Sequence, residues 1–328
     1  MQALFIGGTG NISTAVSRLA VERGIDLFLL NRGLRESEVK GARHLGADVN
    51  DRAALERVLG GRRWDVVVNF IAFREADVER DIALFRRSAE QYVFISSASA
   101  YQKPPRHPLV TESTPLVNPF WEYSRNKIAC EERLLRAHRE HDFPVTIVRP
   151  SLTYDRVLPI ALGGFHDFTL VERLRRGEPI VVHGDGTSLW TLTHSDDFAR
   201  GFIGLLGNAR AIGHAFHVTS DEWLTWNQIY EEIAHAAGAP ARLVHIPTEF
   251  IVRVAPELRG TLLGDKAHSS LFDNSKIRSF VPDFRATIPF RDGIRRTLAW
   301  FDERPERRTT VAENDRLLDR LLESYGHA

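Results

Sequence analysis

Short apolar runs alternate with longer amphipathic stretches through the first half of the chain. The runs are four to nine residues long and end in small or polar residues, which is typical of buried strands. They are residues 1–6, 26–30, 64–72, 92–95 and 145–148. The amphipathic stretches, with apolar positions at helical spacing, are 14–23, 51–59, 76–89 and 120–141. Strands that alternate with helices predict right-handed crossovers and a doubly wound parallel sheet in an α/β protein.

The pattern changes after residue 155, where the elements become shorter and less regular. Helices are expected at 168–176, 226–237, 290–301 and 317–322, and a short strand at 180–183. A chain of 328 residues is long enough for two unequal lobes. We therefore expect a smaller, mixed α/β second lobe in the C-terminal half.

Composition narrows the range of partners. The 43 lysines and arginines balance the 43 aspartates and glutamates, so no net field attracts nucleic acid or an anionic membrane. The single cysteine, Cys130, excludes an internal disulfide and is typical of a reducing cytoplasm, where we expect the protein. We also expect no membrane span, no leader peptide and no metal site, since no apolar run or cysteine–histidine spacing indicates one.

A glycine-rich turn joins the first strand to the first helix. Its sequence is Gly7-Gly8-Thr9-Gly10-Asn11-Ile12-Ser13. A turn in this position presents backbone N–H groups to a phosphate, and the helix dipole adds to the attraction. Ser13 stands where a third glycine is usual and is small enough to let helix and strand approach closely. The turn predicts a site for the diphosphate of a dinucleotide.

A second candidate for chemistry comes from a strand end and the helix that follows it. The strand 92–95 ends in Ser96 and Ser97, while Tyr123 and Lys127 lie four residues apart and so share one face of a helix. A tyrosine normally keeps its proton up to about pH 10, and an ammonium one turn away should lower the pKa of that phenol. Ser97 could then hold a substrate oxygen while Tyr123 exchanges a proton with it. The alternative is an ordinary surface tyrosine and lysine on an amphipathic helix.

Together these motifs resemble the extended short-chain dehydrogenase/reductases, a family that includes NAD-dependent sugar-nucleotide epimerases and dehydratases. The resemblance covers nearly the whole chain in order and implies a Rossmann-like fold. Besides the glycine turn and the Ser–Tyr–Lys set, the segments that carry it are 46–49, 66–72, 94–101, Glu112, Pro115, Pro119, Arg149-Pro150 and 194–197.

The resemblance implies an oxidoreductase that moves hydride between nicotinamide and a carbinol or carbonyl carbon. Tyr123 would be the acid and base, Lys127 would lower its pKa and hold a ribose hydroxyl, and Ser97 would orient the substrate oxygen. The expected cofactor contacts are Gly7, Gly10, Asn11, Ile12, Asn31, Arg32, Asp48, Val49, Phe70, Ile71, Ala72, Tyr123, Lys127 and Pro150. The expected division is a dinucleotide-binding domain of 1–155, with 193–220 returning to it, and a substrate-binding lobe of 156–192 and 221–328.

The end of the second strand bears on which nicotinamide dinucleotide binds. An acid there usually binds the ribose hydroxyls of NAD, whereas an arginine accommodates the 2′-phosphate of NADP. This chain has Asn31 in place of the acid, followed by Arg32 and Arg35. We therefore expect NADP in preference to NAD. The alternative is a solvated arginine beside a neutral ribose contact.

Three departures from the family's pattern bear on the substrate. Ala98 and Ser99 follow Ser97 where the dehydratases have an Asp-Glu pair, which disfavours dehydration. Leu152 and Trp190 stand where UDP-sugar epimerases have an asparagine and an arginine that hold the diphosphate. An indole cannot replace a bidentate guanidinium. Trp190 is interpreted either as core of the second lobe or as an apolar wall against a cyclic substrate.

The combined hypothesis is a cytoplasmic NAD(P)-dependent epimerase, dehydrogenase or ketoreductase without a metal. Its expected partner is a small molecule, either a free or nucleotide-linked sugar or a natural-product alcohol, and the candidate assembly is a homodimer. We expect neither a nucleic-acid nor a membrane partner. Two rivals are a nucleic-acid-binding relative, which zero net charge disfavours, and a cofactor-sensing relative, which would usually lack the tyrosine.

Overall fold

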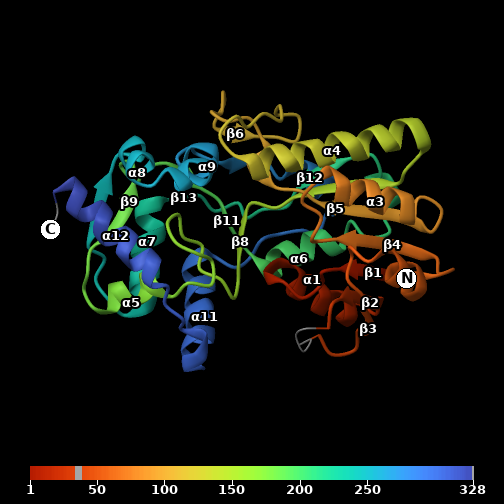
Figure 1. Ribbon diagram of the computed structural model, residues 1–328, viewed down its shortest axis with the longest axis horizontal. Helices are drawn as coiled ribbons and strands as arrows, with labels where there is room; N and C mark the ends of the chain where they lie inside the picture. Colours follow the sequence, from red (N-terminus) through yellow and green to blue (C-terminus); the bar gives the residue numbers. More distant parts are fainter. Residues whose placement is uncertain (34–38, 327–328) are drawn as a thin grey trace.

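The computed structural model describes residues 1–33 and 39–326. Its larger lobe is built on one sheet of seven parallel strands in the order β12-β7-β5-β4-β1-β2-β3 (Figure 1). These strands are β1 (Gln2–Ile6), β2 (Asp26–Asn31), β3 (Arg43–Gly46), β4 (Trp64–Asn69), β5 (Ala89–Ile95), β7 (Val145–Arg149) and β12 (Ala215–His217). The strand order reverses between β1 and β4, so the doubly wound α/β fold predicted from the sequence is confirmed.

Helices cover both faces of this sheet. They are α1 (Asn11–Glu22) and α6 (Ser195–Ile203) on one face, and α2 (Arg52–Leu59), α3 (Glu75–Phe85) and α4 (Glu122–His141) on the other (Figure 1). Alternate residues of β1 enter the two cores. Ala3 and Phe5 pack with α1 and α6, whereas Leu4 and Ile6 pack with the helices opposite. This burial on both faces explains why the strands are continuous apolar runs.

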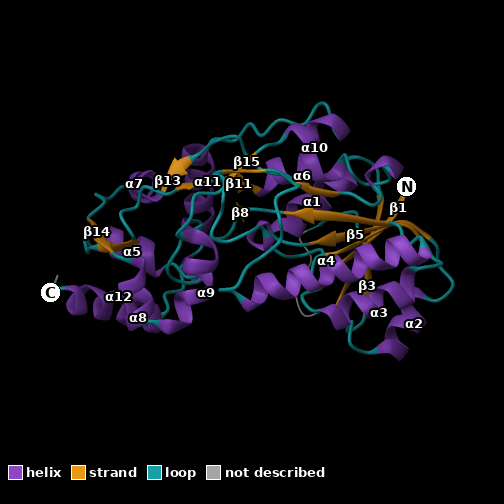
Figure 2. Ribbon diagram, turned by 90° about the horizontal axis from the view of Figure 1, so that it is seen from above, coloured by secondary structure: helices purple, strands orange, loops and turns teal. Residues whose placement is uncertain are grey.

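The smaller lobe has a core of its own, beside the sheet lobe (Figure 2). Its helices are α5 (Thr169–Arg175), α7 (Trp226–Ala237), α8 (Thr248–Val254), α11 (Phe290–Asp302) and α12 (Ala312–Tyr325). Its strands are β9 (Ile180–His183), paired with β14 (Leu243–Ile246), and β10 (Leu189–Trp190), paired with β13 (Leu224–Thr225). The remaining elements are β6 (Leu109–Val110), β8 (Leu152–Tyr154), β11 (Leu192–His194), β15 (Leu271–Phe272), α9 (Arg259–Thr261) and α10 (Ser275–Phe280).

Several element boundaries differ from the predicted ones. The strand predicted over 64–72 ends at Asn69, because the Asn69 Oδ1 accepts the N–H of Ile71 (2.8 Å) and turns the backbone. The helix predicted over 76–89 ends at Phe85, since Ala89 already belongs to β5. These ends depend on tertiary pairing, which apolar spacing does not encode.

Segments from the C-terminal half return to the sheet lobe. The segment 193–220 contributes α6 and also β12, which extends the sheet beside β7. Ile277 of α10 and Phe284 also pack in the core beneath α1 and α6. The chain therefore crosses between the lobes again beyond residue 221.

Two kinds of feature are absent from the described ranges, 1–33 and 39–326. No helix there is long and apolar enough to cross a membrane. Nor does that part of the chain gather three or more histidine, cysteine, aspartate or glutamate side chains in a group that could hold a metal ion.

Candidate active site

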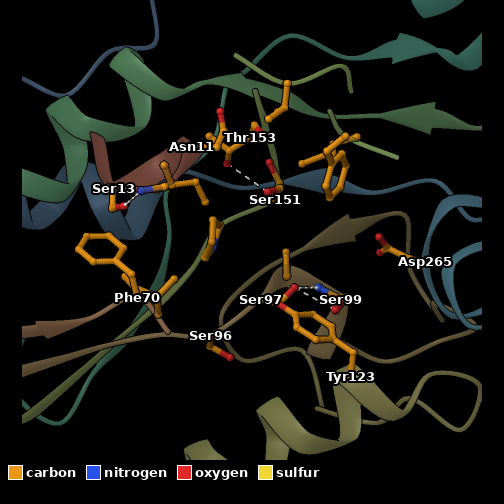
Figure 3. Close-up of a pocket in the computed structure, with 18 of the residues that line it drawn as sticks. Asn11, Ser13, Phe70, Ser96, Ser97, Ser99, Tyr123, Ser151, Thr153 and Asp265 are labelled. Atoms are coloured by element: carbon orange, nitrogen blue, oxygen red, sulfur yellow. Dashed lines mark hydrogen bonds between the residues drawn. The ribbon is translucent and has the colours of Figure 1, made fainter. Parts of the chain in front are cut away.

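A cavity of about 480 Å³ lies at the carboxyl ends of the sheet strands (Figure 3). Ligands bind at this edge of doubly wound sheets, and small-molecule sites have volumes of roughly 300–1,000 Å³. Ser13 and Phe70 lie at one end of the cavity in Figure 3, Asp265 lies at the other, and Ser97 and Tyr123 lie between them. Of the residues predicted from the sequence, the cavity brings together Gly7, Gly10, Asn11, Ile12, Phe70, Ile71, Ser97, Tyr123 and Pro150.

The glycine turn forms the floor of one end of this cavity. Gly7 has φ +80°, and a Cβ added there would lie 2.4 Å from Ile71 Cγ2, so only glycine fits. Ser13, at the usual third-glycine position, holds the turn with its side chain. Its Oγ accepts the N–H of Gly10 (2.7 Å) and donates to the carbonyl of Gly7 (2.8 Å). The turn therefore leaves an open cradle above the first residues of α1.

A second cavity of about 600 Å³ adjoins the first, because Gly7, Gly10 and Ile71 line both. The other predicted residues that line it are Asn31, Arg32, Asp48 and Val49. Asn31 Oδ1 accepts the N–H of Gly33 (2.9 Å), and Arg32 is exposed at the rim. Arg35, the other cation expected here, lies outside the described residues.

The two adjoining cavities fit an extended dinucleotide. The cradle above Gly7 and Gly10 would receive the diphosphate, and the second cavity would hold the adenosine end. Asn11 supplies an independent sign of a ligand. Its Nδ2 donates to the carbonyl of Thr153 (2.9 Å), but its buried Oδ1 has no hydrogen-bond partner among the residues that the structure describes.

Ser97 and Tyr123 reach the middle of the cavity from different elements. Ser97 follows β5, and its Oγ lies 2.9 Å from the Oγ of Ser99, which in turn accepts a hydrogen bond from Ser124 (2.8 Å). Burial raises the pKa of Tyr123 to about 12, while a hydrogen bond with Ser97 acts in the opposite direction. The phenol therefore holds its proton at neutral pH, next to a serine hydroxyl.

Lys127 does not lower the pKa of Tyr123 as the sequence suggested. Its ammonium is buried, with 1% of the residue exposed, and donates to the carbonyls of Ala72 (2.7 Å) and Ile95 (2.7 Å). The expected lowering of the Tyr123 pKa is wrong for this structure, because burial dominates and raises that pKa. Desolvation also lowers the pKa of Lys127 itself to about 8. Neither Lys127 nor Ala72 lines the two cavities.

A buried ion pair fixes the strand ends beneath the site. Arg149, at the end of β7, donates to both carboxylate oxygens of Glu131 on α4, at 2.9 and 2.6 Å. Ser96, beside Ser97, donates to the same carboxylate (2.5 Å). Glu131 therefore ties α4 to the ends of β5 and β7, which carry the site.

Other residues that line the cavity were not predicted from the sequence. Trp121 lies just before α4, and the second lobe closes the cavity with Phe165, His166, Asp265, Lys266 and Ser270. The second-lobe residues belong to no local motif, because the fold brings them from distant segments. Trp190 belongs to the core of the second lobe, and its interpretation as a wall against a cyclic substrate stays a prediction. It packs against Trp226 with ring centroids 5.5 Å apart, and it lines the cavity.

The sheet, the glycine turn and the two cavities define a dinucleotide-binding enzyme of the Rossmann type. A model of the NAD dependent epimerase/dehydratase family matches residues 3–219, and the chain belongs to that family. It is an enzyme, a nicotinamide-dependent oxidoreductase of the extended short-chain dehydrogenase/reductase type, as predicted from the sequence.

Two curated relatives and a solved structure illustrate the similarity. 2'-dehydrokanamycin reductase of Streptomyces kanamyceticus is 28% identical over 76% of this chain and 70% of its own. Chloroplast stem-loop binding protein of 41 kDa b from Arabidopsis thaliana is 30% identical over 75% of this chain and 66% of its own. UDP-glucose 4-epimerase of Thermus thermophilus, solved with NAD, superposes with a TM-score of 0.74 over 92% of this chain and 99% of its own, at 20% identity. This last likeness shows the fold alone.

Proposed function

We propose that the protein reduces a carbonyl carbon, or oxidises the corresponding carbinol, with NADP as the hydride carrier. One observation carries the proposal: Ser97 and Tyr123 lie together on the wall of the cavity that begins at the glycine turn (Figure 3). When bound, the nicotinamide gives hydride to the carbonyl carbon or takes it from the carbinol. The protein supplies the proton and the orientation.

The proton comes from the Tyr123 hydroxyl. With a pKa of about 12, this phenol is protonated at neutral pH and can donate to a carbonyl oxygen as that oxygen gains charge. Ser97, held by Ser99, orients the same oxygen. Epimerisation would use the same hydroxyl first as a base and then as an acid, and it is the second candidate.

Lys127 is proposed as a positioning residue for both Tyr123 and the cofactor. Its Nζ lies 5.8 Å from the centre of the Tyr123 ring. An ammonium has three N–H donors, and the carbonyls of Ala72 and Ile95 take two of them. One donor remains for a ribose hydroxyl. The two fixed carbonyls hold α4 at a set distance from the ends of β4 and β5.

NADP is proposed over NAD because the described rim of the second cavity has a cation at Arg32 and an amide at Asn31. The Asn31 Oδ1 is already used by the N–H of Gly33, so its amide N–H groups would serve as the donors to a ligand. A 2′-phosphate would accept from them and from the guanidinium, whereas an acid at Asn31 would repel it.

The substrate is proposed to be a sugar, free or nucleotide-linked, or a similar natural-product alcohol. The cavity is walled by Trp121, Trp190 and Leu152, which suit the face of a ring. Among the curated relatives, one is named 2'-dehydrokanamycin reductase. The absence of an Asp-Glu pair after Ser97 disfavours dehydration.

Three further features belong to the proposal. Residues 1–155 with 193–220 would form the dinucleotide-binding domain, and 156–192 with 221–328 the substrate-binding lobe, apart from the return at Ile277 and Phe284. A homodimer would be the assembly. A cytoplasmic location rests on the single cysteine, Cys130.

The test is mass spectrometry of the nucleotide that co-purifies, followed by NADPH oxidation with a panel of keto sugars and cyclic ketones. Exchangeable NADP and turnover of a ketone are expected. Tightly held NAD that never exchanges would instead indicate an epimerase. Binding of a stem-loop RNA without any turnover would revive the nucleic-acid rival, which the balance of 43 basic and 43 acidic residues disfavours.

A further inference from the structure

The second lobe places charged side chains at the cavity end farthest from the glycine turn, where the proposed chemistry does not use them. Asp265 and Lys266 line this end, and Lys103 lies behind them. Each Asp265 carboxylate oxygen faces one ammonium. Oδ1 lies 4.0 Å from Lys103 Nζ, and Oδ2 lies 3.9 Å from Lys266 Nζ. Both distances are too long for hydrogen bonds.

The two ammonium groups are buried with few acceptors. Lys103 is 4% exposed and Lys266 is 5% exposed. Lys103 donates one hydrogen bond, to Ser270 Oγ (3.0 Å), and the Lys266 Nζ donates none to any residue that the structure describes. Because an ammonium has three donors, this burial is unfavourable without further acceptors. Desolvation accordingly lowers the pKa of both lysines.

The backbone holds Lys266 in place. Residues Leu262–Lys266 form a π-helical turn, closed by the N–H of Ala267 on the carbonyl of Leu262 (2.9 Å). The Lys266 carbonyl accepts from His183 Nε2 (3.0 Å) and from Trp226 Nε1 (3.1 Å). Single π-helical turns are rare in proteins, and those that occur are often found at functional sites.

Aromatic walls increase the effect of the charge. Lys266 Nζ lies 5.8 Å from the centre of the Trp121 ring, and Lys103 Nζ lies 6.0 Å from that of Trp190. Both indoles line the cavity, so apolar ring faces flank the two ammonium groups. Two cations against one carboxylate leave an excess of positive charge in apolar surroundings, where an ion pair is stronger than in water.

We propose that Lys266, supported by Lys103, forms a subsite for an anionic oxygen group of the substrate, a carboxylate or a phosphate. The oxyanion supplies the acceptors that the ammonium groups lack. Asp265 keeps its carboxylate toward the cavity and accepts a hydrogen bond from a neighbouring substrate hydroxyl. The inference rests on the proposed function, since it places the substrate in the cavity that holds Tyr123.

Calorimetric titration of the NADP-loaded protein tests the subsite without turnover. The probes are glucuronate, glucose 6-phosphate and uncharged glucose. Both charged probes should bind at least about tenfold more tightly than glucose, the ratio that one charge-assisted hydrogen bond gives. Whichever charged probe binds more tightly shows whether the anionic group of the substrate is a carboxylate or a phosphate.

Variants show whether Lys266 is the source of the preference. Lys266→Met should remove most of it, and Lys266→Arg should keep it. Lys40→Met, which removes an exposed lysine outside the cavity, should change nothing. Equal binding of all three probes, no saturable binding of either charged probe, or an equal loss for all probes in Lys266→Met would each overturn the proposal.

The outcome is separable from that of the proposed function. Tyr123→Phe should keep the preference for charged probes while it loses turnover. If that variant keeps both, the proton-donor role of Tyr123 fails and the subsite stands. If the wild type reduces a ketone but shows no preference for charge, the subsite fails and the function stands.

Discussion

Lys127→Met removes a buried ammonium while it keeps most of the volume of the side chain. The pKa of this lysine falls from 10.5 to about 8 in the folded protein because of desolvation. Between these values the unfolded chain binds a proton that the folded chain does not, so the stability of the wild type rises with pH. The variant lacks this contribution.

The size of the effect follows from the shift. Each pKa unit corresponds to about 1.4 kcal/mol, so from about pH 7 to about pH 9.5 the wild type should gain about 2 kcal/mol relative to the variant. Urea denaturation at intervals of pH measures this difference. The variant also loses the hydrogen bonds to the Ala72 and Ile95 carbonyls, which lowers its free energy of unfolding at every pH. This constant loss does not change how the difference between wild type and variant depends on pH.

A matched control removes a lysine in contact with water. Lys40 is exposed, so Lys40→Met should follow the wild type across the same pH range. A flat difference between wild type and Lys127→Met, or a wild type that loses stability relative to the variant as the pH rises, would refute the reasoning that Lys127 is desolvated.

Three further predictions concern the cofactor groove and its support. Arg32→Ala should weaken NADP about tenfold and NAD little, because a charge-assisted bond to the 2′-phosphate is lost; titration of both cofactors checks this, and an equal loss contradicts it. Glu131→Ala should lower the free energy of unfolding by about 3–5 kcal/mol, since buried Arg149 loses its partner; a loss below about 1 kcal/mol in urea denaturation contradicts it. Gly7→Ala should abolish dinucleotide binding, because its Cβ would lie 2.4 Å from a neighbouring side chain, whereas Gly24→Ala at φ +74° has open space; equal binding by the two variants contradicts the steric argument.

The sequence was informative where chemistry and fold share one local motif. The glycine turn, Ser97 and Tyr123 each lie at a strand end or on a helix face, so their spacing predicted that they meet at one edge of the sheet. The structure places all of them around one cavity.

Features that depend on tertiary burial were not predictable. A helical spacing showed that Tyr123 and Lys127 share a face, but only packing decides that desolvation raises one pKa and lowers the other. Asp265 and Lys266 reach the cavity through a π-helical turn far along the chain. Nor did the composition of the sequence indicate that Ile277 packs in the core of the sheet lobe.

The measurement that tests the central claim most directly is turnover by Tyr123→Phe. The variant loses only the hydroxyl, so NADPH oxidation with a ketone that the wild type reduces should fall by on the order of a hundred- to ten-thousand-fold. Its affinity for NADP, measured by titration in the same preparation, should stay close to that of the wild type. Turnover near the wild-type rate would contradict the assignment of Tyr123 as the proton donor.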